Sequence, residues 1–83
     1  SGERLVDTTS ALLAELRRDV GGVIRVSANT PLLIEKDTEI EATRPVTVYM
    51  PDSVIEITEW RRLSVKGPVT FEGTRCLMVR DYA

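Results

Sequence analysis

Histidine is absent from this 83-residue chain, and cysteine occurs once, as Cys76. Without histidine, Ser-His-Asp and Cys-His nucleophilic arrangements are excluded, and the commonest zinc ligand is missing. One cysteine forms no internal disulfide and builds no zinc or iron–sulfur site by itself. Neither glycine-rich phosphate-binding motif, G-x-G-x-x-G or G-x-x-x-x-G-K-[ST], occurs. We therefore expect no catalytic residue, no metal and no cofactor, and a protein that is not an enzyme.

Aromatic residues and long apolar runs are scarce too. Only Tyr49, Trp60, Phe71 and Tyr82 are aromatic, so the core must be built from valine, isoleucine and leucine. No apolar run approaches the ~20 residues that span a membrane, and no signal-peptide pattern opens the chain. The net charge of −2 predicts no bulk attraction to nucleic acid or to a membrane. We expect a soluble protein whose localisation the sequence leaves open.

The length of the chain indicates one small domain over residues 1–83. A helix is expected over about 7–20, where aspartate and threonine at the start can cap it with a side-chain oxygen. Apolar residues at helical spacing would form one buried face. Gly21 and Gly22 would end the helix, because glycine enters the left-handed conformation without a steric penalty. The apolar face would consist of Leu12, Leu13, Leu16 and Val20.

After Gly22 the apolar residues alternate with polar ones, which is typical of strands, over about 23–80. The short strands fall into two alternating sets that recur about every fifteen residues, as expected of an internal repeat. This pattern favours a short β-solenoid, similar to a parallel β-helix, with the helix as a cap on its first coil. An antiparallel β meander or barrel with one helix is the alternative, because tight turns separate the strands.

The order of helix, G-G-V-I-R-V, and strands such as P-V-T-V and G-P-V-T-F-E-G resembles a known family. It is similar to the N-terminal helix and first coils of pectate-lyase-like right-handed parallel β-helix proteins, over about Asp7 to Glu72. The resemblance implies a right-handed parallel β-helix. Coils of fifteen residues are short for that family, whose rungs have three strands, and Asn29 is the only asparagine, so no asparagine ladder forms. No catalytic residue is carried over.

An arginine stands two residues before three of the apolar-x-Val segments, in T-R-P-V-T-V, W-R-R-L-S-V and T-R-C-L-M-V. Stacked coils would bring Arg44, Arg61 and Arg75 together at one corner, beside Trp60 and Arg62. Tryptophan flanked by arginines is typical of a protein–protein contact. The same residues could bind an anionic saccharide. Nucleic acid is not expected, because one aromatic residue offers too few stacking surfaces.

The last strand segment predicts a second surface. Leu77 and Val79 alternate in it, with Tyr82 just beyond, and an edge strand can pair with another chain. We therefore expect a structural or interaction module, an assembly or oligomerisation domain of a larger protein, with self-association or a protein partner. Binding of an anionic ligand through the arginines is one alternative. An N-terminal fragment of a carbohydrate-active β-helix enzyme is the other.

Overall fold

The computed structural model describes residues 2–73 and 77–79. The described chain is mainly strands with one helix, α1 (Thr9–Arg18), as expected. The strands are β1 (Arg4–Val6), β2 (Gly22–Val26), β3 (Leu32–Ile34), β4 (Thr38–Glu41), β5 (Val46–Tyr49), β6 (Ile55–Ile57), β7 (Leu63–Lys66), β8 (Val69–Glu72) and β9 (Leu77–Val79).

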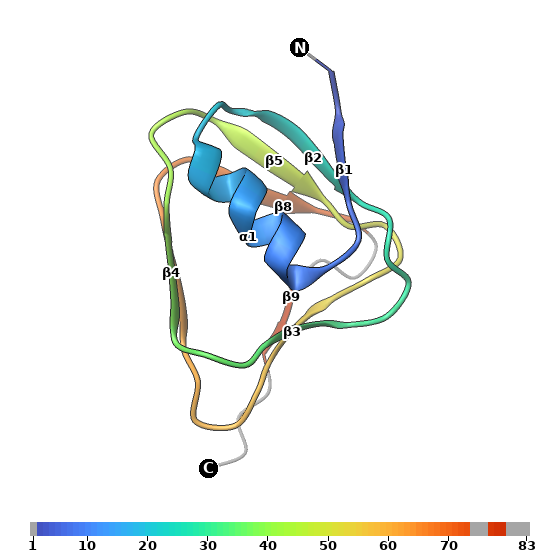
Figure 1. Ribbon diagram of the computed structural model, residues 1–83, viewed down its shortest axis with the longest axis vertical. Helices are drawn as coiled ribbons and strands as arrows, with labels where there is room; N and C mark the ends of the chain where they lie inside the picture. Colours follow the sequence, from blue (N-terminus) through green and yellow to red (C-terminus); the bar gives the residue numbers. More distant parts are fainter. Residues whose placement is uncertain (1, 74–76, 80–83) are drawn as a thin grey trace.

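The strands form three small sheets, ordered β1-β2-β5-β8, β3-β6-β9 and β4-β7. Every pairing between described strands is parallel. After α1 the chain visits the three sheets in a fixed rotation, so that the sheets outline a triangle around the core (Figure 1). The antiparallel meander or barrel is therefore wrong as a description of this chain.

The register of the pairs corrects the predicted spacing. Gly22 lies beside Val46 and Val46 beside Val69, and one passage through the three sheets takes 22 to 25 residues. The predicted interval of about fifteen residues is wrong, because strands at that spacing, such as those that begin at Leu32 and Val46, belong to different sheets. Alternation has the same period of two in every strand, so it cannot tell a two-sided circuit from a three-sided one.

The predicted alternation itself is confirmed by the pattern of burial. Inward-facing aliphatic side chains from all three sheets make one continuous core, and Ile24, Ile40 and Val48 are at most 1% exposed. Leu33, which interrupts the alternation in the sequence, is 38% exposed and lies on the outer face of β3. The core is aliphatic, as the scarcity of aromatic residues predicts.

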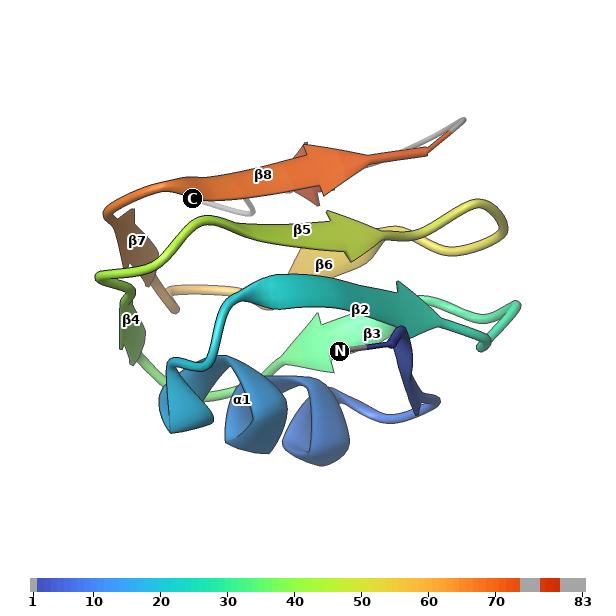
Figure 2. The same ribbon diagram turned by 90° about the horizontal axis from the view of Figure 1, so that it is seen from above.

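Helix α1 covers one end of this core. Thr8 is its N-cap and accepts a hydrogen bond from the backbone N–H of Ala11. Leu12 and Leu16 are buried against the strands, while Leu13 is half-buried. In Figure 2, α1 lies below β2 and β3, and β8 lies at the opposite end of the molecule. The helix thus acts as a lid on the first passage of the chain through the sheets.

The predicted helix is confirmed with narrower bounds, and its predicted ending is wrong. The left-handed C-cap is Asp19, with φ of 53°, and not the following glycines. Gly21 and Gly22 do take positive φ, but Gly21 lies in the connection to β2 and Gly22 is the first residue of that strand. Val20, expected on the apolar face, lies beyond the helix and is 42% exposed.

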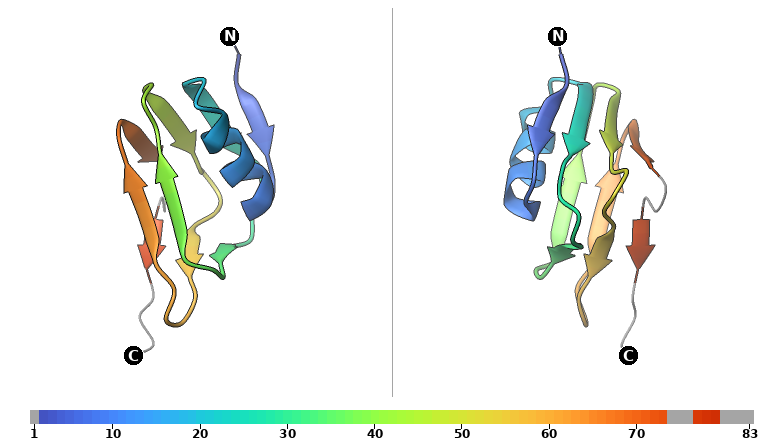
Figure 3. Two further views of the ribbon diagram at one scale, coloured as in Figure 1. Left: turned by 60° about the vertical axis from the view of Figure 1, so that its left-hand side comes forward. Right: turned by 90° about the vertical axis from the view of Figure 1, so that its right-hand side faces the viewer.

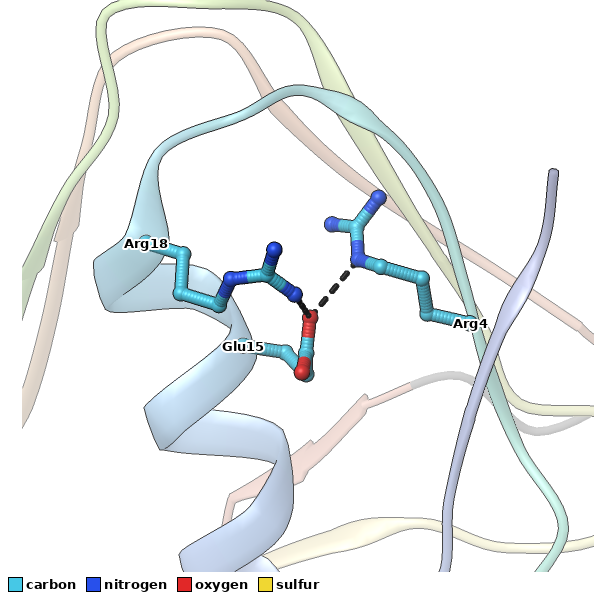
Figure 4. A network of polar contacts seen from close by, with 3 residues as sticks. All are labelled: Arg4, Glu15 and Arg18. Atoms are coloured by element: carbon cyan, nitrogen blue, oxygen red, sulfur yellow. Dashed lines mark hydrogen bonds and ion pairs between the residues drawn. The ribbon is translucent and has the colours of Figure 1, made fainter. Parts of the chain in front are cut away.

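An ion-pair network joins α1 to β1 (Figure 4). Glu15 Oε1 accepts from Arg4 Nε at 2.7 Å and from Arg18 Nη1 at 2.9 Å. Burial alone would raise the pKa of Glu15, but the hydrogen bonds and charges of both arginines outweigh it and lower the pKa. The network fixes the helix across the strand that begins the first sheet.

Candidate functional site

The two ends of the molecule differ. At one end α1 lies over the core, whereas at the other the last strands of the three sheets lie together, β8 beside β5, β7 beside β4 and β9 beside β6 (Figure 3). We call the surface formed by β7, β8 and β9 the far end. Within the described residues, no helix or further strand covers it. An end strand of a sheet can accept another strand at its outer edge.

Apolar side chains of the far end are less buried than their neighbours one strand inward. Val65 is half-buried, whereas its register partner Ile40 is 1% exposed. In the first sheet, Phe71 is half-buried beside Val48, which is fully buried. Leu63 and Val69 are half-buried too. The far end therefore presents an apolar surface of aliphatic and aromatic side chains.

The space between α1 and the described strands has no room for a ligand. The apolar space between α1 and the sheets has a volume of about 10 Å³, which is at the limit of what one water molecule needs. Its lining comes from the helix, from the inner strands and from Leu63, Val65 and Phe71 of the far end. The half-buried residues are thus the outermost layer of the packed core.

The predicted self-association edge lies partly within the described residues. Leu77 and Val79 belong to β9, which is the last described strand of the sheet β3-β6-β9. Tyr82 lies outside the described residues. The position of β9 is the one that the edge hypothesis requires, and its role in self-association stays a prediction.

The expected row of arginines is wrong. Val46 lies beside Val69, so Arg44, two residues earlier, is level with Gly67 in the corner before the first sheet. Leu63 lies beside Thr38, so Arg61 is level with Lys36 at a different corner. Arg75 lies outside the described residues. Residues at the same distance before a strand do not align here, because their strands belong to different sheets.

Three of the predicted binding residues do stay together, on the turn between β6 and β7. Trp60 is 72% exposed and has a φ of 64°, in the left-handed region. Arg61 closes the turn by donating its backbone N–H to the Thr58 carbonyl at 3.0 Å. The backbone N–H of Arg62 donates to Asp37 Oδ1 at 3.0 Å. The turn is therefore held by hydrogen bonds from its backbone N–H groups, and the indole remains in solvent.

A groove of about 430 Å³ runs between α1 and the segment 33–38. Its apolar floor includes Leu13 and Ile34. The charged residues along it balance in sign, with Arg17 and Lys36 opposed by Glu35 and Asp37. A surface of balanced charge gives no net attraction for an anion. The groove therefore adds no support to the predicted binding of an anionic ligand.

Polar side chains at the corners tie successive passages of the chain together, and sequence reasoning missed them. Asp19 accepts from Thr43, and the hydroxyl of Ser53 donates to the Thr30 carbonyl at 2.6 Å. The hydrogen bonds from Thr43, side chain and then backbone, hold the pKa of Asp19 below its ordinary value. The partners lie 23 or 24 residues apart. They could have been predicted only from the correct number of residues in one passage through the three sheets.

Within the described residues, no group of three or more histidine, cysteine, aspartate or glutamate side chains is placed to hold a metal ion. The one helix in that part of the chain falls short of the length and apolarity needed to cross a membrane. No protein-family model, curated protein or solved structure significantly matches the chain. Functional inference therefore depends on the geometry of the far end.

Proposed function

We propose that the chain is a short parallel β-solenoid and that it serves as a non-enzymatic assembly module, joining a second copy of itself through the far end. The solenoid interpretation is supported by the all-parallel pairing and by the fixed rotation of the chain through three sheets. The passage of the chain through three strands also supports the resemblance to the pectate-lyase-like β-helix families. The rungs of those proteins have three strands, for which the expected coils of fifteen residues were too short.

The observation that carries the assembly function is the contrast between the two ends. Leu12 and Leu16 of α1 close one end of the core, while Val65 and Phe71 remain half-exposed at the other. Removing apolar surface from water contributes about 25 cal/mol per Å². Covering the strand edges also pairs backbone groups that otherwise depend on water. A second copy supplies both, because it carries an apolar far end of its own.

Sedimentation velocity and light scattering over a wide range of protein concentration test this function. We expect a reversible shift from monomer to an oligomer as the concentration rises. Val65→Lys places an inward-pointing charge at the far end, a device that opposes edge-to-edge association, and should keep the chain monomeric. Leu33→Lys adds the same charge to the outer face of β3, near α1, and should leave association unchanged.

Circular dichroism melting of both variants confirms that they are folded before their association is compared. A wild-type chain that stays monomeric at all concentrations would contradict the assembly function. Anionic-ligand binding is not proposed, because Arg44 and Arg61 lie at different corners. Origin as a fragment of a carbohydrate-active enzyme stays a prediction, and the parent gene tests it by the presence or absence of further β coils.

A further inference from the structure

We infer that two copies meet far end to far end about a two-fold axis, with their β8 strands antiparallel, and that association stops at the dimer. This inference rests on the proposed assembly function and specifies its geometry. It follows from the asymmetry of the molecule, from the order of apolar residues in β8, and from the positions of two charged side chains.

The asymmetry of the ends disfavours a stack of copies in one direction. A head-to-tail contact would press β7, β8 and β9 of one copy against α1 of the next. There the helix already lies across β3 and β4, and Leu12 and Leu16 have their apolar surface buried. At the α1 end β1 also has an outer edge, but the helix lies over β3 and β4, whereas another far end offers the edges of all three sheets together with half-buried apolar side chains. A contact of like with like is isologous and closes with two members.

The alternation of side chains restricts the register of the contact to those that set core-facing residues opposite one another. A two-fold axis across the far end reverses the strand direction, so β8 meets β8 of the second copy in antiparallel orientation. Val69 and Phe71 are the core-facing residues of β8, and Thr70 is exposed on the outer face. Centring the axis on Thr70 sets Val69 of one copy opposite Phe71 of the other. A shift by one residue would set core-facing side chains against outward-facing ones.

Charge complementarity supports the same arrangement. In it, Glu72 at the end of one β8 approaches the corner that precedes β8 of the other copy, where Lys66 lies two residues before Pro68. Both side chains are exposed. Neither forms a hydrogen bond or ion pair with another described residue, although Glu41 is the register partner of Lys66. Because of the two-fold symmetry, the contact between Glu72 of one copy and Lys66 of the other occurs twice.

Charge-swap variants of the whole 83-residue chain test the contact by sedimentation equilibrium. Glu72→Lys sets two lysines against each other, and Lys66→Glu sets two glutamates against each other. Because like charges at an interface oppose binding, each single variant should raise the dimer Kd about tenfold or more. The double variant restores opposite charges in the reversed sense, and its Kd should return to within about threefold of wild type.

Cysteine cross-linking tests the register, in a Cys76→Ser background. Opposed residues of antiparallel strands have Cβ atoms about 4.5–5.5 Å apart, so Thr70→Cys should form an intermolecular disulfide under mild oxidation. Thr47→Cys is the matched control, because Thr47 is the register partner of Thr70 one strand inward in β5. It should not cross-link at the same protein concentration.

The outcomes separate the inference from the proposed function. Restored dimerisation of the double variant, with cross-linking at position 70 alone, supports the two-fold contact. A dimer that is insensitive to both charge changes and does not cross-link at position 70 overturns it and leaves self-assembly standing. Oligomers that keep growing with concentration also overturn it. A wild-type chain that is monomeric throughout overturns the proposed function itself.

Discussion

The carboxylate of Asp19 accepts hydrogen bonds from the backbone N–H and from the hydroxyl of Thr43, at 2.9 and 2.6 Å. Asp19 is also the left-handed C-cap of α1, and its own N–H donates to the Leu16 carbonyl. One residue therefore ends the helix and fastens it to the corner that leads into β5. This contact, together with the ion pairs of Glu15, joins α1 to the strands.

The Asp19 contact predicts a dependence of stability on pH. The hydrogen bonds from Thr43 hold the pKa of Asp19 below its ordinary value in the folded chain. The contribution of the ionised carboxylate is then fully present above the ordinary pKa of aspartate, about 3.9. It is lost as the pH falls through the lowered folded value. Asp19→Asn, whose amide tolerates the left-handed conformation, should unfold at lower urea concentration than wild type at neutral pH.

Urea titrations between neutral pH and about pH 2 measure this difference. The gap between wild type and Asp19→Asn should narrow in the acid range, because wild-type Asp19 becomes protonated there. Asp52→Asn, in the exposed turn after β5, serves as the control and should follow wild type at every pH. A gap that stays constant down to the lowest pH would show that the charge of Asp19 contributes nothing.

The local features of this fold were predictable, and its long-range pairing was not. Alternation of apolar residues predicts the strands, and the threonine cap with the leucine spacing predicts α1, because these signals lie within a few neighbouring residues. The contact of Asp19 with Thr43 spans 24 residues and depends on which strands share a sheet. Since the strands of all three sheets alternate alike, the sequence left that choice open. The row of arginines failed for this reason, with Arg44 and Arg61 at different corners.

Gly67 occupies a corner that no other residue fits. It has φ of 93°, and a Cβ at this position would collide with the backbone carbonyl of Ala42, the residue after β4. Gly67→Ala should therefore destabilise the fold by more than about 2 kcal/mol, from backbone strain and from the clash. Urea denaturation measures the loss. Gly2→Ala, which meets nothing within 4 Å, should change stability by less than about 0.5 kcal/mol.

At Trp60, by contrast, a change to glycine is not expected to destabilise the fold. It has φ of 64° and is 72% exposed, so the left-handed backbone costs energy that little burial offsets. Trp60→Gly should leave the monomer as stable as wild type or up to about 1 kcal/mol more stable, because glycine takes this conformation without strain. Glu59→Gly, one residue earlier and without positive φ, should not stabilise. A clear loss of stability in Trp60→Gly would mean that the indole packs against the fold.

Substitutions of two register partners, Ile40 in β4 and Val65 in β7, test whether the far end becomes buried on association. Ile40 is 1% exposed, so Ile40→Ala should cost about 2–5 kcal/mol of unfolding free energy at every protein concentration. Its register partner Val65 is half-buried, and Val65→Ala should cost about 1 kcal/mol in the monomer.

When a second copy covers the far end, Val65 becomes buried and the same substitution also weakens the dimer. Because association stabilises the folded state by mass action, the Tm difference between wild type and Val65→Ala should widen as the protein concentration rises. The Tm difference for Ile40→Ala should widen far less, because the Ile40 side chain is already buried in the monomer. Calorimetry at low and high protein concentration measures both, and a Val65→Ala difference independent of concentration would contradict burial of the far end by a second copy.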